Sequence, residues 1–194
     1  MLIDRLTPIS TDQFWDHPLK VVMGGLFLAL VAPIELFSGT EIPVTLQTLV
    51  VLLLGFILGP WRGALAVLLY LGLGALGLPV FAEGNGGWQH LFGPTGGFLW
   101  SFVLVAGLVG WCAQRPWGQF GWGVPLIWLL AHGLIILLGG LWLGCVRGFE
   151  GLWASLFTLW PGLLLKSVVG TLMTWGSNRL MEYLIENREG NEAR

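Results

Sequence analysis

Residues 53–81 read LLGFILGPWRGALAVLLYLGLGALGLPVF, and the only charged side chain in this stretch is Arg62. A soluble surface helix keeps one polar face, whereas this run is apolar or small on every side. Gly59 and Pro60 interrupt it, because glycine readily ends a helix and proline suits the first turn of the next one. The stretch therefore predicts two successive apolar helices of the kind that cross a membrane.

The rest of the chain has the same character. Of its 194 residues, 55% are hydrophobic and 10% are charged, which is more apolar surface than a soluble domain of this size can bury. Thirty glycines and twelve tryptophans also fit a membrane protein, where small residues let helices approach and indoles favour the headgroup level. A net charge of −2 without a basic run excludes nucleic acid as a partner. We expect an all-α integral membrane protein without a soluble domain.

Apolar runs between breaks predict six transmembrane helices. Their ranges are 19–37, 44–58, 62–81, 97–113, 122–145 and 161 to about 181. Residues 152–160 are too few to span a bilayer and predict an interfacial or half-inserted turn. Residues 1–18 are polar and lack the features of a signal peptide. The predicted organisation is an N-terminal segment (1–18), a six-helix substrate-binding domain (19–184) and a polar tail (185–194).

The distribution of basic residues predicts the orientation, because cytoplasmic segments hold the excess of lysine and arginine. In a six-helix arrangement one side holds Arg5, Lys20, Arg62, Arg115, Arg179, Arg188 and Arg194. The other side holds only Arg147. We therefore expect both termini in the cytoplasm, and the glycine-rich segment 82–96 outside, between the third and fourth helices.

Lys166 is the first candidate for a ligand-binding residue. It lies inside the last predicted helix, five residues after Pro161, about 8 Å along the helix axis. An ionisable group within a membrane helix costs roughly 3 kcal/mol, so it usually faces a partner or a cavity. A lysine that extends to the lipid headgroups is the alternative. The ligand-binding interpretation is favoured because the outer surface is near.

The segment 82–97, AEGNGGWQHLFGPTGG, is the second candidate. Its six glycines allow a backbone that lies close to a ligand, so the segment is either a lid or a merely flexible loop. Polar and aromatic side chains suited to a solute are Asn85, Gln89, Thr95, Phe81, Trp88 and Phe92. Gln47, in an otherwise apolar helix, needs a hydrogen-bond partner, either a ligand or another helix.

Enzyme and cofactor functions find no support in the residues. The segment 161–167, PGLLLKS, lacks the glycine that precedes the lysine of a phosphate-binding loop, so this chain should not bind ATP. No nucleophile elbow surrounds Ser101 or Ser155, and no acidic residue is placed to orient His132. Cys112 and Cys145 have no ligand-like spacing to the histidines. We expect no metal, no cofactor and no catalysis.

Four sequence motifs resemble the BioY family, the biotin-binding substrate-capture (S) subunits of energy-coupling-factor (ECF) transporters. They are IPVTLQTL (42–49), the stretch 53–81, GPTGGF (93–98) and PGLLLK (161–166). The resemblance implies a six-helix protein of the bacterial plasma membrane that captures biotin from outside. It also implies a transmembrane coupling subunit and two ATPases as partners, which alone use ATP.

The resemblance also implies roles for individual residues. For the biotin site these are Lys166, Asn85, Thr95, Gly96 and Gly97, with Gln47 and Tyr70 as further candidates. Phe81 and Trp88 are candidates for the same site because their rings offer flat apolar surface. For contact with the coupling subunit the implied residues are Gly24, Gly25, Ala29 and Ala32 in the first helix, although small residues also serve packing within the chain. Lys166 suits either the ureido oxygen or the carboxylate of biotin.

One position departs from the family pattern, which reads PGDxxK. Leu163 stands where the aspartate belongs. A capture subunit of the same fold for another vitamin-like solute is therefore an alternative, and a non-transporting membrane scaffold is a more distant one. Binding of labelled biotin separates these hypotheses.

Overall fold

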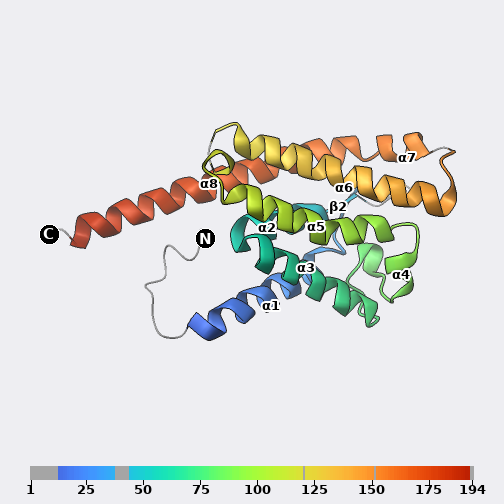
Figure 1. Cartoon of the computed structure of the whole chain (residues 1–194), viewed down its shortest axis with the longest axis horizontal. Helices are drawn as coiled ribbons and strands as arrows, with labels where there is room; N and C mark the ends of the chain where they lie inside the picture. The colour runs from blue at the N-terminus through green and yellow to red at the C-terminus, as the bar shows by residue number, and fades with distance from the viewer. Residues whose placement is uncertain (1–12, 38–43, 120, 151, 193–194) are drawn as a thin grey trace.

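The computed structural model describes residues 13–37, 44–119, 121–150 and 152–192. In this part the chain is mostly helical, and its long helices lie side by side (Figure 1). The elements in chain order are α1 (Gln13–Val31), β1 (Glu35–Phe37), β2 (Val44–Thr45), α2 (Gln47–Leu58), α3 (Pro60–Ala75), the 3-10 turn η2 (Ala82–Gly84), α4 (Gln89–Phe92), α5 (Gly96–Ala113), the 3-10 turn η3 (Pro116–Gly118), α6 (Gly123–Arg147), α7 (Leu152–Phe157) and α8 (Trp160–Glu192).

Helix α5 lies at the centre of the bundle, where it packs against α2, α3 and α6, while α1 packs on α3 and α8 on α6 and α2. Helices α2 and α5 approach each other closely at Gly55, where a Cβ would overlap the carbonyl oxygen of Ala106. Large apolar side chains such as Met23, Leu30 and Trp122 point outward and are exposed. A surface rich in exposed leucine and tryptophan is expected where lipid, not water, surrounds the protein.

The predicted end of the first helix and the predicted start of the second helix are both wrong. Helix α1 ends at Val31, not at residue 37, because Pro33 lacks an N–H and disfavours helical geometry in the residue before it. Strand β1 follows and pairs antiparallel with β2. Helix α2 therefore begins at Gln47 and not at residue 44.

The third predicted helix is also too long. Helix α3 ends at Ala75, not at residue 81, because Gly77 adopts a positive φ of 96° and Pro79 cannot continue the hydrogen-bond ladder. By contrast, α5 and α6 begin and end within two residues of the predicted ranges 97–113 and 122–145. Helix α7 is as short as expected, with six residues.

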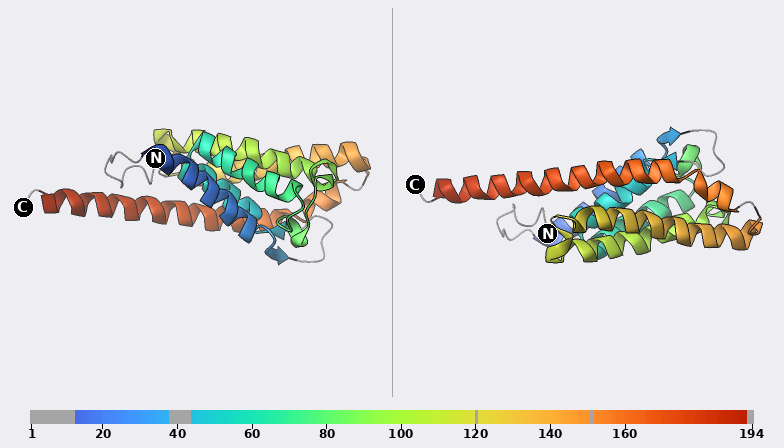
Figure 2. Two further views of the ribbon diagram at one scale, coloured as in Figure 1. Left: turned by 90° about the horizontal axis from the view of Figure 1, so that it is seen from below. Right: turned by 90° about the horizontal axis from the view of Figure 1, so that it is seen from above.

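Helix α8 has 33 residues and holds Pro161 in its first turn, as predicted. It does not stop near residue 181, however, and is continuous through the predicted tail to Glu192. Its sequence there, EYLIENREGNE (182–192), holds four glutamates, which are good helix formers, so loss of hydrophobicity does not end the helix. Figure 2 shows the C-terminal half of α8 projecting beyond the other helices.

Polar side chains line the contact between α6 and α8. Trp128 Nε1 donates to Thr174 Oγ1 at 3.2 Å, and Ser167 Oγ lies 3.0 Å from His132 Nδ1. Thr171 Oγ1 donates to the carbonyl oxygen of Ser167 within α8. The polar side chains on this face of α8 therefore form their hydrogen bonds within the protein.

Two helices of the described residues, α5 and α6, are long and apolar enough to cross a membrane by length and composition alone. Helix α2 and residues 18–31 of α1 are apolar but shorter. The start of α1 and the end of α8 lie at the end of the molecule opposite α4 and α7 (Figures 1 and 2). The number of spans stays a prediction.

Candidate functional site

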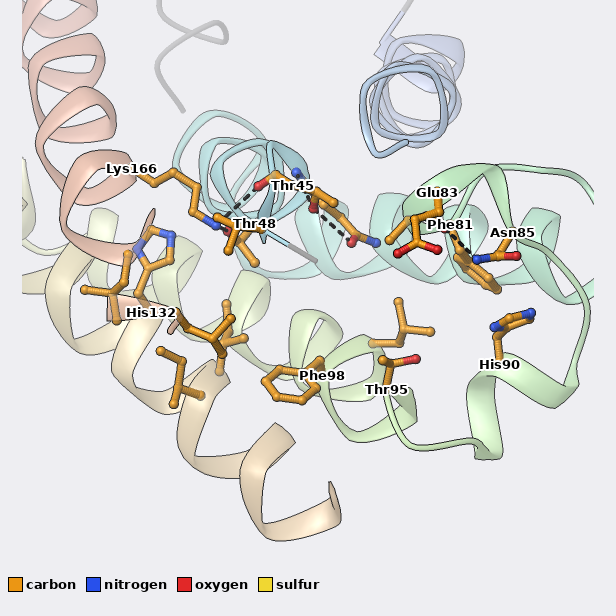
Figure 3. A pocket seen from close by; sticks show the side chains of 18 residues that line it. Thr45, Thr48, Phe81, Glu83, Asn85, His90, Thr95, Phe98, His132 and Lys166 are labelled. Atoms are coloured by element: carbon orange, nitrogen blue, oxygen red, sulfur yellow. Dashed lines mark hydrogen bonds between the residues drawn. The ribbon is translucent and has the colours of Figure 1, made fainter. Parts of the chain in front are cut away.

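A cavity of about 240 Å³ lies among α2, α5, α6, α8 and the segment around η2. This volume lies somewhat below the usual range for small-molecule sites, about 300 to 1,000 Å³. Its lining residues are Val44, Thr45, Gln47, Thr48, Phe81, Ala82, Glu83, Asn85, His90, Thr95, Phe98, Leu99, His132, Ile135, Ile136, Leu159, Leu163 and Lys166. Lys166 and His132 lie at one end, and Asn85 and His90 at the other (Figure 3).

Lys166 dominates the buried end of the cavity. It enters from the second turn of α8 and is only 7% exposed, so it does not extend to the lipid headgroups. Its Nζ donates to the carbonyl oxygen of Thr45 at 3.2 Å and to Thr48 Oγ1 at 2.6 Å. Both partners are neutral oxygens. They orient the ammonium group but leave its charge for an anionic or strongly polar ligand atom to stabilise.

Gln47 connects the cavity wall to helix α3. Its main-chain N–H donates to Thr45 Oγ1 at 3.3 Å, and its Nε2 donates to the hydroxyl of Tyr70. Tyr70 is fully buried on α3 and does not line the cavity. Gln47 therefore has an intramolecular partner, and Tyr70 holds it in place from behind.

The open end of the cavity is formed by one short stretch of chain, from Phe81 to Thr95. Phe81 is buried, and its ring meets Tyr70 edge-on at 5.6 Å between ring centroids. Asn85 is exposed, and its Nδ2 donates to the carbonyl oxygen of Ala82 at 3.0 Å. Trp142 of α6 donates to the carbonyl oxygen of Gly93 at 2.9 Å. The segment thus forms an exposed rim of the cavity that hydrogen bonds hold in place.

The family model for BioY matches residues 9–183. The chain belongs to the BioY family. It is 41% identical over 138 residues to the biotin transporter BioY of Rhodobacter capsulatus, covering 69% of each chain. It is 39% identical over 134 residues to the probable biotin transporter BioY of Pyrococcus horikoshii, covering 68% of this chain and 78% of that one.

The fold agrees with this BioY assignment. The structure is similar to the crystal structure of the S-component for biotin from an ECF-type ABC transporter, with a TM-score of 0.72 and 22% sequence identity. The similarity covers 90% of this chain and 95% of the other. The chain therefore has the membrane fold of an ECF S-component.

Not every residue nominated from the sequence for the biotin site lies at the cavity. Lys166, Gln47, Phe81, Asn85 and Thr95 line it. Four other nominated residues do not, and one of them is Tyr70, which lies behind Gln47. Gly96 and Gly97 are buried in the first turn of α5, where a Cβ on Gly97 would overlap the Trp142 side chain, so they serve packing. Trp88 is 67% exposed and lies outside the lining.

The small residues nominated for the coupling subunit have a different location from the one expected. Gly24, Gly25, Ala29 and Ala32 are all buried within this BioY chain. A Cβ on Gly25 would press on the carbonyl oxygen of Ala66 in α3. In this structure the stripe is therefore a packing face between α1 and its neighbours, and the exposed face of α1 carries large apolar side chains instead.

Sequence reasoning missed several lining residues of the BioY cavity. Thr48 and His132 are the most important, because they flank Lys166 (Figure 3). The sequence held a signal for His132. It is an ionisable group in an apolar helix, and such a group usually faces a partner or a cavity, as was argued for Lys166. Glu83 and His90 gave no such signal, because polar residues in a loop are ordinary.

Proposed function

We propose that this BioY chain captures biotin from outside the cell as the S-component of an ECF-type transporter. The observation that carries the proposal is the cavity with the buried ammonium of Lys166 at its inner end, in a chain whose family relatives are named biotin transporters. Those relatives are named as transporters and not as enzymes.

The chemistry of the cavity supports biotin. The ligand has a ureido ring with two N–H donors and one C=O acceptor, an apolar thiophane ring and a carboxylate on a flexible chain. The apolar part of the wall is formed by Phe98, Leu99, Ile135, Ile136, Leu159 and Leu163. A mostly apolar wall with a few polar groups at defined places is typical of small-molecule sites.

The decisive experiment for the proposal is equilibrium binding of labelled biotin to the purified chain in detergent. We expect saturable binding that unlabelled biotin displaces and that other water-soluble vitamins at the same concentration do not. Absence of saturable binding by monodisperse, folded protein would contradict the proposal.

A capture subunit for a different vitamin-like solute is the second candidate function. The observation that favours it is Leu163, which lines the cavity three residues before Lys166, at the position where the family pattern has aspartate. A leucine there removes a hydrogen-bond acceptor from this side of the site. Displacement of labelled biotin by another vitamin with higher affinity would support this candidate.

The proposed membrane topology has six spans, formed by α1, α2, α3, α5, α6 and α8, with both termini in the cytoplasm. The even number of crossings is supported by the start of α1 and the end of α8, which lie at the same end of the molecule (Figure 1). The excess of basic residues at that end supports the orientation.

The topology can be tested with single cysteines in a background from which Cys112 and Cys145 are removed. A cysteine at Asn85 should react with an impermeant thiol reagent on intact cells, and one at Asn187 should react only after lysis. The opposite pattern would show that the orientation is reversed.

The proposed partners are a transmembrane coupling subunit and two ATPases. The solved structure with the same fold is described as part of an ECF-type ABC transporter. Co-expression with such a module should give a complex that survives purification and takes up biotin when ATP is supplied.

Because the small-residue stripe of α1 is buried here, we expect Gly25→Leu to lower the yield of folded protein even without the module.

A further inference from the structure

His132 is the most deeply enclosed polar side chain at the cavity that lacks a full set of partners. It projects from α6, is 3% exposed and lines the cavity next to Lys166 (Figure 3). Its Nε2 has no hydrogen-bond partner, and among the described residues no other buried side-chain nitrogen or oxygen lacks one. A buried polar atom left unpaired is costly, so its presence calls for an explanation.

The contacts of the other ring nitrogen, Nδ1, show whether Nε2 is a hydrogen-bond donor or acceptor. His132 Nδ1 lies 3.0 Å from the carbonyl oxygen of Trp128 and 3.0 Å from Ser167 Oγ. A carbonyl oxygen only accepts hydrogen bonds, so Nδ1 carries the proton and donates it. In the neutral ring Nε2 is then an acceptor.

The buried end of the cavity therefore offers a donor and an acceptor side by side. Lys166 Nζ is a donor, and two of its three hydrogens are directed to Thr45 and Thr48. His132 Nε2 is the neighbouring acceptor. A ureido group presents C=O and N–H side by side and matches this pair. A carboxylate offers only oxygen lone pairs and would oppose the lone pair on Nε2.

We propose that His132 is a ligand-binding residue whose Nε2 accepts a hydrogen bond from a ureido N–H of biotin, while Lys166 donates to the ureido oxygen. This inference rests on the proposed function. Leu163 places an apolar side chain where the family pattern has a carboxylate, and His132 supplies an acceptor from α6 instead of α8. The ureido ring then lies at the buried end, and the flexible chain of biotin extends toward the open end, which Glu83, Asn85 and His90 line.

A pair of substitutions separates this role from a structural one. In His132→Gln, Oε1 takes the approximate place of Nε2 and keeps an acceptor there, whereas in His132→Asn, Nδ2 takes the place of the donor Nδ1 and no atom reaches the place of Nε2. We expect His132→Asn to weaken biotin binding by about tenfold or more, since a ligand N–H loses its acceptor. His132→Gln should retain most of the affinity. The double variant His132→Asn with Leu163→Asp should recover binding, because the aspartate restores an acceptor.

Ligand analogues provide a test that needs no variant. Biotin methylated at one ureido nitrogen or the other is compared with biotin on the wild-type chain, and at least one methylation should weaken binding by about tenfold or more. In His132→Gln and His132→Asn, folding is checked by thermal unfolding and monodispersity.

The outcomes distinguish the two proposals. Wild-type protein that does not bind biotin overturns both the proposed function and this inference. Wild-type protein that binds biotin, with His132→Asn binding equally well or both methylated analogues binding like biotin, overturns the inference alone. Equal losses in His132→Gln and His132→Asn assign His132 a packing role and also overturn it.

Discussion

The two ends of the cavity are built in different ways. The buried end combines β2, α2, α6 and α8, and Thr45 and Lys166, which are 121 residues apart, meet there. The open end is a single stretch of chain, from Phe81 to Thr95, that is fastened mainly by bonds within itself and to α5 and α6. The first kind of construction needs the whole fold, whereas the exposed residues of the second can vary with little effect on the bundle.

This difference suggests that the two ends of the cavity have different roles in ligand binding. Polar groups at the buried end are shielded from water, so their hydrogen bonds and charges contribute more to affinity. Groups at the open end compete with solvent and contribute more to entry and exit of the ligand. Substitutions that compare the two ends can confirm or contradict this division.

The largest effect is expected at Lys166. Lys166→Met removes the buried ammonium and its hydrogen bond to the ligand, which should cost about 1.5 to 3 kcal/mol, or roughly tenfold to a hundredfold in affinity. Binding of labelled biotin measures it. Leu164→Met on the exposed face of α8 is the matched control and should bind like the wild type. Equal affinity of Lys166→Met and the control would show that the buried end does not hold the ligand.

A smaller effect is expected at Thr48, which orients Lys166 through a 2.6 Å hydrogen bond. Thr48→Val keeps the shape of the side chain but removes the acceptor, so binding should weaken by roughly two- to tenfold. Thr48→Ser retains the hydroxyl and should stay close to the wild type. If serine and valine at this position behave alike, the hydroxyl has no part in positioning the lysine.

At the open end, Asn85→Ala should change rates more than affinity. Loss of the bond from Asn85 to the carbonyl oxygen of Ala82 loosens the rim. We expect faster association and faster dissociation of biotin in stopped-flow or surface-based kinetics, with the dissociation constant within about threefold of the wild type. The control is Gln89→Ala, which removes a similar bond, to the carbonyl oxygen of Gly86, away from the cavity. A loss as large as that of Lys166→Met would place the main polar anchor at the open end.

The smallest effect is expected at Trp88. Its side chain is 67% exposed and does not line the cavity, so Trp88→Ala should leave biotin affinity unchanged within twofold. Phe81→Ala, by contrast, removes a buried ring that covers Tyr70 and should reduce both thermal stability and affinity. A clear loss of affinity in Trp88→Ala would mean that the rim closes over the ligand.

The sequence predicted the helical membrane fold because hydrophobicity and helix breaks are local properties. Helices α5 and α6 were placed within two residues, since each is bounded by glycine and polar residues. The β1–β2 pair was not predicted, because a pair of such short strands depends on contact between two separate segments. The end of α8 was missed because the predicted boundary marked the loss of hydrophobicity, and helical structure does not require hydrophobicity.

The candidate site was predicted unevenly for the same reason. Lys166 was identified because a charge in an apolar helix is unusual in itself. Which residues surround it depends on the packing of helices that are distant in the chain, so Thr48 and His132 were not found. The sequence also does not show which way a helix face points. Gly25 and Ala29 form a stripe of small residues, but the sequence does not show whether that stripe faces a partner protein or α3.

The polar face of α8 has a consequence for how the protein is made. Lys166, Ser167, Thr171 and Thr174 are buried, and several of their hydrogen bonds reach α2 and α6. A segment with a lysine and three hydroxyls enters lipid poorly by itself. It follows α6 in the chain, so during synthesis the groups that satisfy it are already in the membrane when it emerges from the ribosome. We therefore expect α8 to insert efficiently only behind its own upstream helices, and to fail as an isolated segment in an insertion assay.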